Sequence, residues 1–420
     1  MKFLFDPDSP EFWSQESAER ELRRVFEICD GCRRCFNLCP SFSVLLGRID
    51  DRDGDVGALT RQEHREVVDL CYQCKLCFNH CPYTPPHEFA IDFPRLMLRA
   101  KAVRARQDGV TRQDRILAQT DRLGRLGTAL APVTNWANRM PAVRGVMEGL
   151  IGIHRDRRLP CYAGEPFVRW FARRGPRTDG APAARAALFC TCSVNYNCPP
   201  VGQAAVEVLE HNRVAVTCPE QRCCGMPALD GGDLPGAIEA AAYNVEHLAE
   251  AIRAGAQRIV VPGPTCSYVL KQEYPLLLKT EDARLVAEHT ADLCEYLMQL
   301  REQGLLDTAF PNRVGKVAYQ IPCHLRAQNI GFKSRDLMRL IPGTEVVLIE
   351  RCSGMDGTWG MKKPYFELSL KVARPLLREI DEAGAELVVT DCPLSGLQIE
   401  QGTGRRPLHP IEVVKRAYGL

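Results

Sequence analysis

Cys29–Pro40 reads C-D-G-C-R-R-C-F-N-L-C-P, and this stretch decides how the N-terminal part of the chain is organised. A second stretch, Cys71–Pro82, reads C-Y-Q-C-K-L-C-F-N-H-C-P and has the same form, C-x2-C-x2-C-x3-C-P. In such runs three thiolates bind one [4Fe-4S] cluster, and the fourth cysteine binds the other cluster of the pair. The spacing therefore predicts two clusters that exchange the last cysteine of each run.

This exchange assigns the eight cysteines to two ligand sets. The first set is Cys29, Cys32, Cys35 and Cys81. The second set is Cys71, Cys74, Cys77 and Cys39. A zinc ribbon or a disulfide framework is the alternative, but structural zinc sites use two cysteine pairs, and two runs ending in Cys-Pro exceed that number. Hydrophobic residues at helical spacing predict helices over 11–28 and 60–70, and therefore a mainly helical ferredoxin domain.

The composition is that of a soluble globular protein. The chain has 420 residues, of which 45% are hydrophobic and 25% charged, and its net charge is +2, which indicates no particular partner. This length predicts two or three domains. The 20 cysteines cluster in motifs, which favours metal binding in a reducing compartment over disulfides. We expect no transmembrane helix, no signal peptide at Met1–Phe5, and a cytoplasmic protein that contacts the inner membrane face at most peripherally.

Residues 99–178 are strongly basic, with 17 Lys and Arg against 6 Asp and Glu. Apolar residues such as Leu126, Leu130, Trp136 and Met140 recur among them at spacings that predict amphipathic helices. The plain interpretation is a helical connector with a solvated basic face. The alternative is a docking surface for an acidic partner or an anionic membrane. Nucleic-acid binding is not expected, because no stacking platform or recognition motif is present.

The C-terminal part alternates short β-rich runs with longer helical runs. The predicted strands are 187–189, 214–217, 259–261, 316–319, 345–349 and 386–390. The predicted helices are 202–210, 237–254, 291–303, 334–340 and 365–383. This alternation is typical of parallel βαβ units, and a Gly/Pro-rich segment at 175–182 marks a boundary before them.

Four domains of an α+β multidomain protein follow from these patterns. They are a helical two-cluster ferredoxin domain (1–105), a basic helical connector (106–182), and two α/β halves with parallel sheets (183–305 and 306–420).

The two α/β halves repeat one another. Arg222–Met226 reads R-C-C-G-M and Arg351–Met355 reads R-C-S-G-M. Cys192 precedes Cys223 by 31 positions, and Cys323 precedes Cys352 by 29. Such self-similarity indicates a duplicated unit. Since ligands bind beyond the carboxyl ends of parallel strands, cysteines that follow three strands can converge on one centre. The glycine of each motif would let the backbone pass close to a metal centre.

These residues carry a family resemblance that covers nearly the whole chain. The pattern C-x(about 30)-C-C-G with a final cysteine pair resembles the cysteine-rich CCG domain of heterodisulfide reductases. Two copies behind a two-cluster ferredoxin domain resemble the iron–sulfur subunits of glycolate oxidase and of anaerobic glycerol-3-phosphate dehydrogenase. The stretches Pro264–Ser267 and Ile321–Leu325 look closest to the glycerol-3-phosphate group.

The resemblance implies a metal site in each half, with departures from the family pattern. The first half keeps Cys192, Cys223, Cys224 and Cys266, and has Gly263 where the family has a cysteine. The second half keeps Cys323, Cys352 and Cys392, and has Ser353 and Ser395 at two cysteine positions. Four thiolates can bind an iron–sulfur cluster or zinc, and three can bind a cluster with an open position.

Neither half has the five thiolates of the family's disulfide-cleaving clusters, so disulfide reduction is in doubt. His324 is either a fourth ligand of the second site or, more often for such a residue, a neighbour of the ligands. Cys190, Cys198 and Cys218 are either replacement ligands or buried, inert thiols. Cys161 and Cys294 are expected to be packed.

The resemblance implies an electron-transfer subunit. Neither G-x-G-x-x-G nor G-x4-G-K-[ST] occurs in the chain, so we expect a flavin-dependent dehydrogenase partner to hold the flavin. Electrons would pass through two [4Fe-4S] clusters and one or two further iron–sulfur or zinc centres to a quinone or another acceptor. The alternative is an oxidoreductase whose own substrate binds at a cluster of the duplicated domain, for a reduction of the disulfide or peroxide type. No catalytic residue can be assigned.

Overall fold

The structure, a computed structural model, describes residues 5–175, 181–355 and 357–420, and these form two units. One unit comprises the residues up to Ala118 together with Met226–Ile238, and the other comprises Gln119–Gly225 and Glu239–Leu420. Two segments lie outside the described residues. They are 176–180, which includes most of the predicted Gly/Pro-rich boundary, and Met1–Leu4, where no signal peptide is expected.

The first unit is helical. Its helices are α1 (Gln15–Cys32), α2 (Pro40–Asp50), α3 (Arg61–Leu70), α4 (Leu76–His80), α5 (Phe93–Asp108), α6 (Arg112–Ala118) and α13 (Met226–Asp230). Leu22, Phe26, Leu45 and Leu96 pack in one core with Cys71 and Cys77. The predicted helices at 11–28 and 60–70 are confirmed, and α1 continues as far as Cys32.

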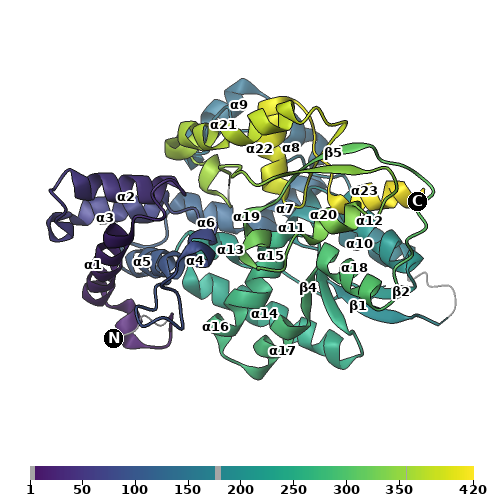
Figure 1. Cartoon of the computed structure of the whole chain (residues 1–420), viewed down its shortest axis with the longest axis horizontal. Coiled ribbons are helices and arrows are strands. Elements are labelled where there is room, and N and C mark those ends of the chain that lie inside the picture. Colours follow the sequence, from purple (N-terminus) through teal and green to yellow (C-terminus); the bar gives the residue numbers. More distant parts are fainter. Residues whose placement is uncertain (1–4, 176–180, 356) are drawn as a thin grey trace. The chain divides into compact units, whose positions relative to one another are not determined.

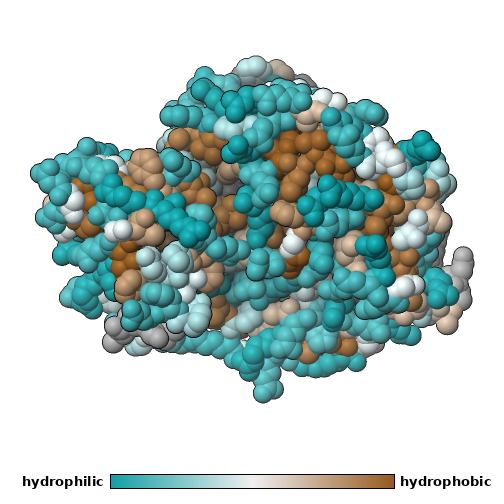
Figure 2. Space-filling view, viewed as in Figure 1, coloured by the Kyte–Doolittle hydropathy of each residue, from teal (hydrophilic) through white to brown (hydrophobic). Residues whose placement is uncertain are grey.

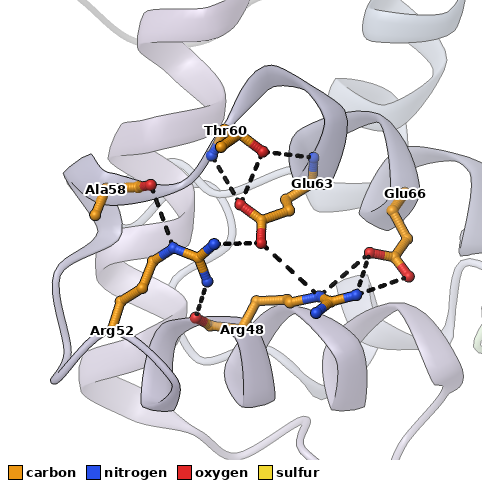
Figure 3. Close-up of polar contacts among 6 residues, drawn as sticks. All are labelled: Arg48, Arg52, Ala58, Thr60, Glu63 and Glu66. Carbon is orange, nitrogen blue, oxygen red and sulfur yellow. Dashed lines mark hydrogen bonds and ion pairs between the residues drawn. The ribbon is translucent and has the colours of Figure 1, made fainter.

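Helix α3, which leads directly into Cys71, is held firmly at its start (Figure 3). The Thr60 hydroxyl accepts a hydrogen bond from the Glu63 backbone N–H, and the Glu63 carboxylate accepts one from the Thr60 backbone N–H, at 2.9 Å. Arg52 and Arg48 bind Glu63 and Glu66 from the side of α2. A capping box of this kind satisfies two backbone donors that the first helical turn leaves free.

The first half of the second unit contains a parallel sheet. Its strands are β1 (Ala184–Leu188), β2 (Val214–Thr217), β3 (Arg258–Val261) and β4 (Thr290–Asp292), in the order β2-β1-β3-β4. The three predicted strands are confirmed, and the start of the helix predicted at 291–303 is wrong. Ala291 pairs with Val260 in the sheet, and the side chain of Asp292 caps the helix that begins at Leu293. A buried strand partner therefore overrides the helical pattern here.

The second half repeats this arrangement. Its strands are β5 (Lys316–Gln320), β6 (Glu345–Ile349) and β7 (Leu387–Thr390), in the order β6-β5-β7, and all are parallel. Leu408 forms a parallel bridge with Val389 beyond β7, where β4 stands in the first sheet. All three predicted strands are confirmed, and the matching strand order reflects the duplication read from the sequence.

Helices flank both sheets (Figure 1). In the first half and the segment before it they are α7 (Thr120–Ala129), α8 (Ala131–Ala137), α9 (Pro141–Ile151), α10 (Phe167–Arg174), α11 (Cys192–Tyr196), α12 (Pro199–His211), α14 (Leu234–Arg253), α15 (Pro264–Tyr268), α16 (Tyr274–Leu278), α17 (Glu281–His289) and α18 (Leu293–Glu302). In the second half they are α19 (Cys323–Ala327), α20 (Lys333–Met338), α21 (Phe366–Glu382), α22 (Pro393–Thr403) and α23 (Pro410–Tyr418).

The two halves share one hydrophobic core. Residues of α12 such as Val208 lie in the same core cluster as Val413 of α23 and Val317 of β5. Figure 2 shows hydrophobic side chains gathered around the region where Figure 1 labels α22 and β5. A helical domain followed by two α/β halves with parallel sheets confirms the predicted fold class.

Candidate metal centres

The last turn of α1 and the loop after it bring one group of thiols together. Cys29 and Cys32 end the helix, and the neighbours that affect the Cys29 thiol electrostatically are Cys35, Cys81 and Cys32. Burial raises the pKa of Cys29 well above its usual value, and these three cysteines raise it further. Burial, Cys81 and Cys32 also raise the pKa of Cys35, to about 11. Only a strong positive charge, such as that of iron, would keep four such sulfurs ionised together.

A second group of thiols forms around Cys77. Burial is the main reason why the pKa of Cys77 lies well above its usual value. The nearby thiols of Cys74, Cys71, Cys39 and Cys35 raise this pKa further. Cys39 comes from the first sequence run, as Cys81 comes from the second. The structure thus brings the last cysteine of each run to the group formed by the other run.

The two runs share a backbone feature that the sequence does not reveal. The residue after the second cysteine of each run, Arg33 or Lys75, has a left-handed backbone, with φ of 51° and 64°. Amide donors also face the sulfurs: the Gln73 side chain donates to Cys71 Sγ at 3.3 Å, and the Tyr83 N–H donates to Cys81 Sγ at 3.4 Å. Such bonds stabilise thiolates. All 20 cysteines lie in the described part of the chain and none forms a disulfide there, and groups of four with N–H donors at sulfur fit a [4Fe-4S] cluster.

A buried ion pair between Lys101 and Asp230 supports the backbone of the cysteine group around Cys77. Lys101 on α5 donates to the Cys71 carbonyl at 3.2 Å and binds the Asp230 carboxylate at 2.7 Å. Burial is the largest single influence and lowers the pKa of Lys101, but Asp230, Cys71 and Asp69 together outweigh it, so that this pKa is raised overall. The backbone of Cys71 is therefore held by a charged side chain that is itself paired with a carboxylate.

In the first α/β half, four cysteines form a chain of sulfur contacts. Cys223 is the neighbour that affects the Cys192 thiol most, Cys192 and Cys224 affect Cys223 most, and Cys223 and Cys266 affect Cys224 most. Cys192 opens α11 after β1, the Cys223–Cys224 pair lies in the loop after β2, and Cys266 lies on α15 after β3. Hydrogen bonds from Cys192 and Cys224 lower the pKa of Cys223 well below its usual value. Three strand ends thus supply one group of four thiols, which fits a cluster or a zinc ion.

Buried polar side chains hold the Cys223–Cys224 loop. Asn244 on α14 accepts from the Arg222 N–H at 2.8 Å and donates to the Cys223 carbonyl at 3.2 Å. The Tyr274 hydroxyl donates to the Cys224 carbonyl at 3.1 Å. Gly225 follows with φ of 88°, a conformation that favours glycine.

The first helix of the basic connector also reaches this loop. Asp121, in the first turn of α7, accepts from the Cys223 N–H at 2.7 Å, and Thr120 contacts the Cys223 thiol. Burial raises the pKa of Asp121, and the bond from Cys223 partly offsets this. Sequence reasoning missed Thr120, Asp121, Asn244 and Tyr274, because no spacing links them to the motifs. A buried Asn among the apolar residues of α14 is the one signal that could have identified a member of the group.

The second half places serines together where the family has cysteines. The Ser395 hydroxyl donates to Ser353 Oγ at 3.0 Å, and both residues are buried. Cys352 Sγ accepts from the Gly354 N–H at 3.3 Å, Cys323 opens α19, and Cys392 precedes α22. The motif glycine of this half, Gly354, packs closely against backbone. A Cβ at this position would lie 2.4 Å from the Ser369 carbonyl oxygen.

His324 lies between the two halves. Its Nδ1 is 2.8 Å from the Thr265 hydroxyl, and its ring stacks on Tyr268 with 5.3 Å between centroids. Both partners belong to α15 of the first half, so this nitrogen positions the ring instead of facing a metal. This contact supports the expectation of a residue that lies beside the ligands.

The remaining cysteines fall into three settings. Burial and the nearby Cys218 raise the pKa of the Cys190 thiol well above its usual value, with Cys218 as the largest cause and a smaller effect from Cys192. Cys198 is half-buried, and burial raises its pKa. Cys294 is buried as expected, whereas Cys161 is exposed, so the expectation that it is packed is wrong.

Comparisons with known proteins match both parts of the chain. The model of the citrate utilization protein B Fer4-like domain matches residues 22–109. The model of the cysteine-rich domain matches residues 186–271 and 317–400. The resemblance read from the sequence and its iron–sulfur character are therefore confirmed for both parts.

Curated proteins are similar to large parts of this chain. The C subunit of anaerobic glycerol-3-phosphate dehydrogenase from Escherichia coli K12 is 32% identical over 304 residues, which are 72% of this chain and 76% of the relative. Lactate utilization protein A of Exiguobacterium is 30% identical over 238 residues, 54% of this chain and 93% of the relative. The B subunit of fumarate reductase (CoM/CoB) from Methanothermobacter marburgensis is 27% identical over 241 residues, 56% of this chain and 45% of the relative.

Proposed function

This chain belongs to the family of the C subunit of anaerobic glycerol-3-phosphate dehydrogenase, and from this premise we propose that it is the electron-transfer subunit of a dehydrogenase complex. A flavin-dependent partner supplies electrons. They pass through two [4Fe-4S] clusters and the cysteine-rich domain to a quinone or another acceptor. The observation that carries this proposal is the crossed grouping of the eight N-terminal cysteines, with Cys81 beside Cys29 and Cys39 beside Cys77.

We assign the cofactors as two [4Fe-4S] clusters and one or two further centres. The chain of contacts from Cys192 to Cys266 supports a four-thiolate centre in the first half, either an iron–sulfur cluster or zinc. Cys323, Cys352 and Cys392 would hold a second centre with one position free of cysteine. The seven cysteines of these two sites are metal ligands in this proposal, and the domain limits 1–105, 106–182, 183–305 and 306–420 remain its working boundaries.

An apolar face of α7–α9 supports contact with a membrane surface. Seven of the eleven exposed large hydrophobic side chains of the described residues lie between Leu126 and Leu150. Leu130 and Trp136 are 59% and 60% exposed, and Arg122 and Arg125 lie on the same helix as Leu126. Apolar side chains flanked by arginines favour the interface of an anionic bilayer. Among the described residues, no helix combines the length and the apolar character needed to span a bilayer.

Helix α7 joins this face to the first cysteine site. Its first turn contacts Cys223 through Thr120 and Asp121, and its later turns expose Leu126. At 1.5 Å per residue, five residues separate the two contacts by about 8 Å along the helix axis. We infer that electrons leave at this end of the protein, which would act in the cytoplasm at the inner membrane face.

Metal analysis and spectroscopy of anaerobically purified protein test the relay. About eight irons would indicate that only the N-terminal sites are filled, and about twelve to sixteen would indicate one or two further clusters. Cys81→Ser should alter the electron paramagnetic resonance signal of one cluster and Cys39→Ser that of the other, whereas Cys294→Ser should alter neither. Clusters that stay oxidised when the partner dehydrogenase and its substrate are added would count against the proposal.

A second function is favoured by the serine pair of the second half. With Ser353 and Ser395 bonded to each other, three cysteines remain, and a cluster held by three thiolates has an iron open to substrate. The protein would then be an oxidoreductase that binds its own substrate. Replacing both serines by cysteine should close the open position. Unchanged electron transfer in that variant, with unchanged spectra, would reject the second function.

A further inference from the structure

The four thiols of the first N-terminal group line one cavity in the helical unit. They are Cys29, Cys32, Cys35 and Cys81. Each of the four is partly exposed, and the exposed residues Arg34 and Pro82 line the same cavity. The cavity therefore lies at the protein surface.

The second cysteine run is covered at positions where the first run is exposed. Gly31 and Arg33 of the first run are exposed. The matching positions of the second run hold Gln73 and Lys75, which are only 1% and 2% exposed. Two of the four thiols of the second group are also buried, whereas all four of the first group are partly exposed. A molecule that approaches from solvent therefore comes closer to the first group than to the second.

Exposed aromatic side chains adjoin the first group. Phe36, which directly follows Cys35, is 42% exposed, and Phe89 is 38% exposed. Phe89 packs on the cavity residue Tyr83 with 5.4 Å between ring centroids, and His87 packs on both rings. Within the described part of the helical unit, Phe36 and Phe89 are the two exposed large hydrophobic side chains. Aromatic side chains are enriched in protein–protein interfaces, so their position marks this surface as a contact site.

Arg34 supplies an exposed positive charge at the same cavity. Its Nε donates to His80 Nε2 at 3.2 Å, and no carboxylate pairs with it in the described part of the chain. The neighbouring Arg33 differs, because it binds Asp30 and Asp50 at 2.5 and 2.6 Å. A positive charge without a counter-charge, placed among aromatic side chains, is complementary to an acidic partner surface.

We propose that an acidic surface of the electron-donor subunit docks at the cavity mouth formed by Arg34, Tyr83 and Phe89. The first group then receives the electrons, and the second group follows it. This inference rests on the proposed function, in which a flavin-dependent partner is the donor, and it adds the order of the two groups and the residues that face the donor. The step moves one electron: the donor's reduced flavin is oxidised to its semiquinone, the cluster is reduced, and no bond of this chain is broken.

Reduced flavodoxin, an acidic flavoprotein that donates single electrons, is the probe for this surface. We expect Arg34→Glu to slow the reduction of the oxidised full chain about tenfold at low ionic strength, with a difference that narrows as salt is added. Phe89 does not line the cavity, and Phe89→Ala should slow the reduction severalfold. Stopped-flow absorbance measures the rates, and iron analysis verifies that each variant retains its clusters.

Matched variants separate docking from a general effect of charge. Arg20→Glu reverses a well-exposed charge near the start of α1 and should leave the rate unchanged. Glu88→Gln removes an exposed negative charge beside Phe89 and should not slow the reduction. Equal slowing by Arg20→Glu and Arg34→Glu would mean that only net charge matters and would overturn the docking site. Wild-type rates in both Arg34→Glu and Phe89→Ala would overturn it as well.

The order of the two groups has its own measurement. A dysprosium chelate in solution accelerates the spin relaxation of a reduced cluster that lies near the surface, and power saturation of the electron paramagnetic resonance signals detects this. We expect the signal altered by Cys81→Ser to relax faster than the signal altered by Cys39→Ser. Equal relaxation of the two signals, or the reverse order, would contradict entry at the first group.

A second copy of this chain is the other candidate for the same surface. We expect wild type and Phe89→Ala to sediment with the same mass, and a wild-type dimer that Phe89→Ala dissociates would overturn the proposal. None of these measurements depends on the acceptor. A protein that passes no electrons to a quinone or another acceptor would therefore reject the proposed relay and leave the order of the two groups intact.

Discussion

Single residues around the first four-cysteine site decide how its backbone is held. Among the described residues, Asp121 is the one charged side chain that bonds the Cys223 N–H, at 2.7 Å. Asn244 and Tyr274 hold the two following carbonyls. Because the Asp121 carboxylate is half-buried and bonds the Cys223 N–H directly, its negative charge acts on the site at short range and with reduced screening.

Replacing Asp121 should therefore separate charge from hydrogen bonding. Asp121→Asn keeps an oxygen that accepts from Cys223 but removes the charge, so the reduction potential of the centre should rise with unchanged iron content. Asp121→Ala leaves the buried N–H without a partner, which should cost about 1–3 kcal/mol. A spectroscopic redox titration and thermal unfolding measure the two effects. The exposed Asp156→Asn is the control, and equal potentials in Asp121→Asn and wild type would contradict the role of the charge.

The buried carboxyl group of Asp292 should make the stability of the folded protein depend on pH. Burial, and then the nearby Asp391, raise the pKa of Asp292 well above its usual value, against the opposing effect of Lys271. The folded state therefore binds a proton that the unfolded state releases above about pH 4. This contribution is fully present below that pH and is lost as the pH rises toward the folded-state pKa.

Asp292→Asn should remove this loss. The amide oxygen still accepts from the Cys294 N–H, which Asp292 bonds at 3.1 Å, and no proton is needed. As the pH rises from 5 to 8, above the pKa of an unfolded aspartate, we expect the melting temperature of the variant to rise relative to that of the wild type. Melting curves of both proteins across this range check the difference. A constant gap between the two would mean that Asp292 does not change protonation on unfolding.

At the scale of elements, α7 depends on glycine for its position. A Cβ at Gly124 would lie 2.2 Å from the Tyr196 ring, and one at Gly127 would lie 2.5 Å from the Tyr162 ring. Tyr196 ends α11, the helix that Cys192 begins. Gly124 thus lets α7 approach α11 closely enough for its first turn to reach Cys223, and Gly127 lets the same helix pass close to Tyr162.

Gly124→Ala should push α7 away from the site. We expect lower stability and a changed spectrum of the first centre, because the aromatic ring cannot yield without moving α11. Gly145→Ala on α9 is the matched control, since its Cβ would meet nothing within 4 Å. That change should raise stability by about 0.5–1 kcal/mol through helix propensity. Thermal unfolding of both variants measures the contrast, and equal effects would argue against close packing of α7.

At the scale of the whole molecule, basic residues and exposed apolar residues are concentrated in the same segment of the chain. The net charge is +2, yet residues 99–178 hold 17 basic and 6 acidic residues. Much of this charge is paired: Arg174 binds Glu210, and Arg155 binds Glu148. The apolar side chains of α7–α9 are what remains available for a surface contact.

Vesicle binding should therefore depend on these apolar side chains. Leu130→Gln with Trp136→Gln should weaken binding to anionic vesicles at least tenfold, since burying one such side chain is worth about 1.5–3 kcal/mol. Sedimentation with phosphatidylglycerol vesicles measures the loss. Leu130→Met with Trp136→Phe keeps the apolar surface and should bind normally. Equal binding of the Gln variant and the wild type would move the contact elsewhere.

The sequence by itself determined the features that depend on local spacing. Two C-x2-C-x2-C-x3-C-P runs indicated two crossed ligand sets, and six of the seven strands were predicted from β-rich runs that alternate with helices. The duplication was visible in the two R-C-[CS]-G-M motifs, and the family followed from them. These features are readable because their residues lie within one run or one turn of the chain.

Only the tertiary structure decided which distant residues meet. It brought Asp121 to Cys223, Ser353 to Ser395 and His324 to Thr265. It also made a strand of Thr290–Asp292, which pairs with β3 although its own sequence continues a helical pattern. Contacts between residues far apart in the chain are set by how helices and strands pack. No local spacing records that packing, because it depends on the burial of many side chains at once.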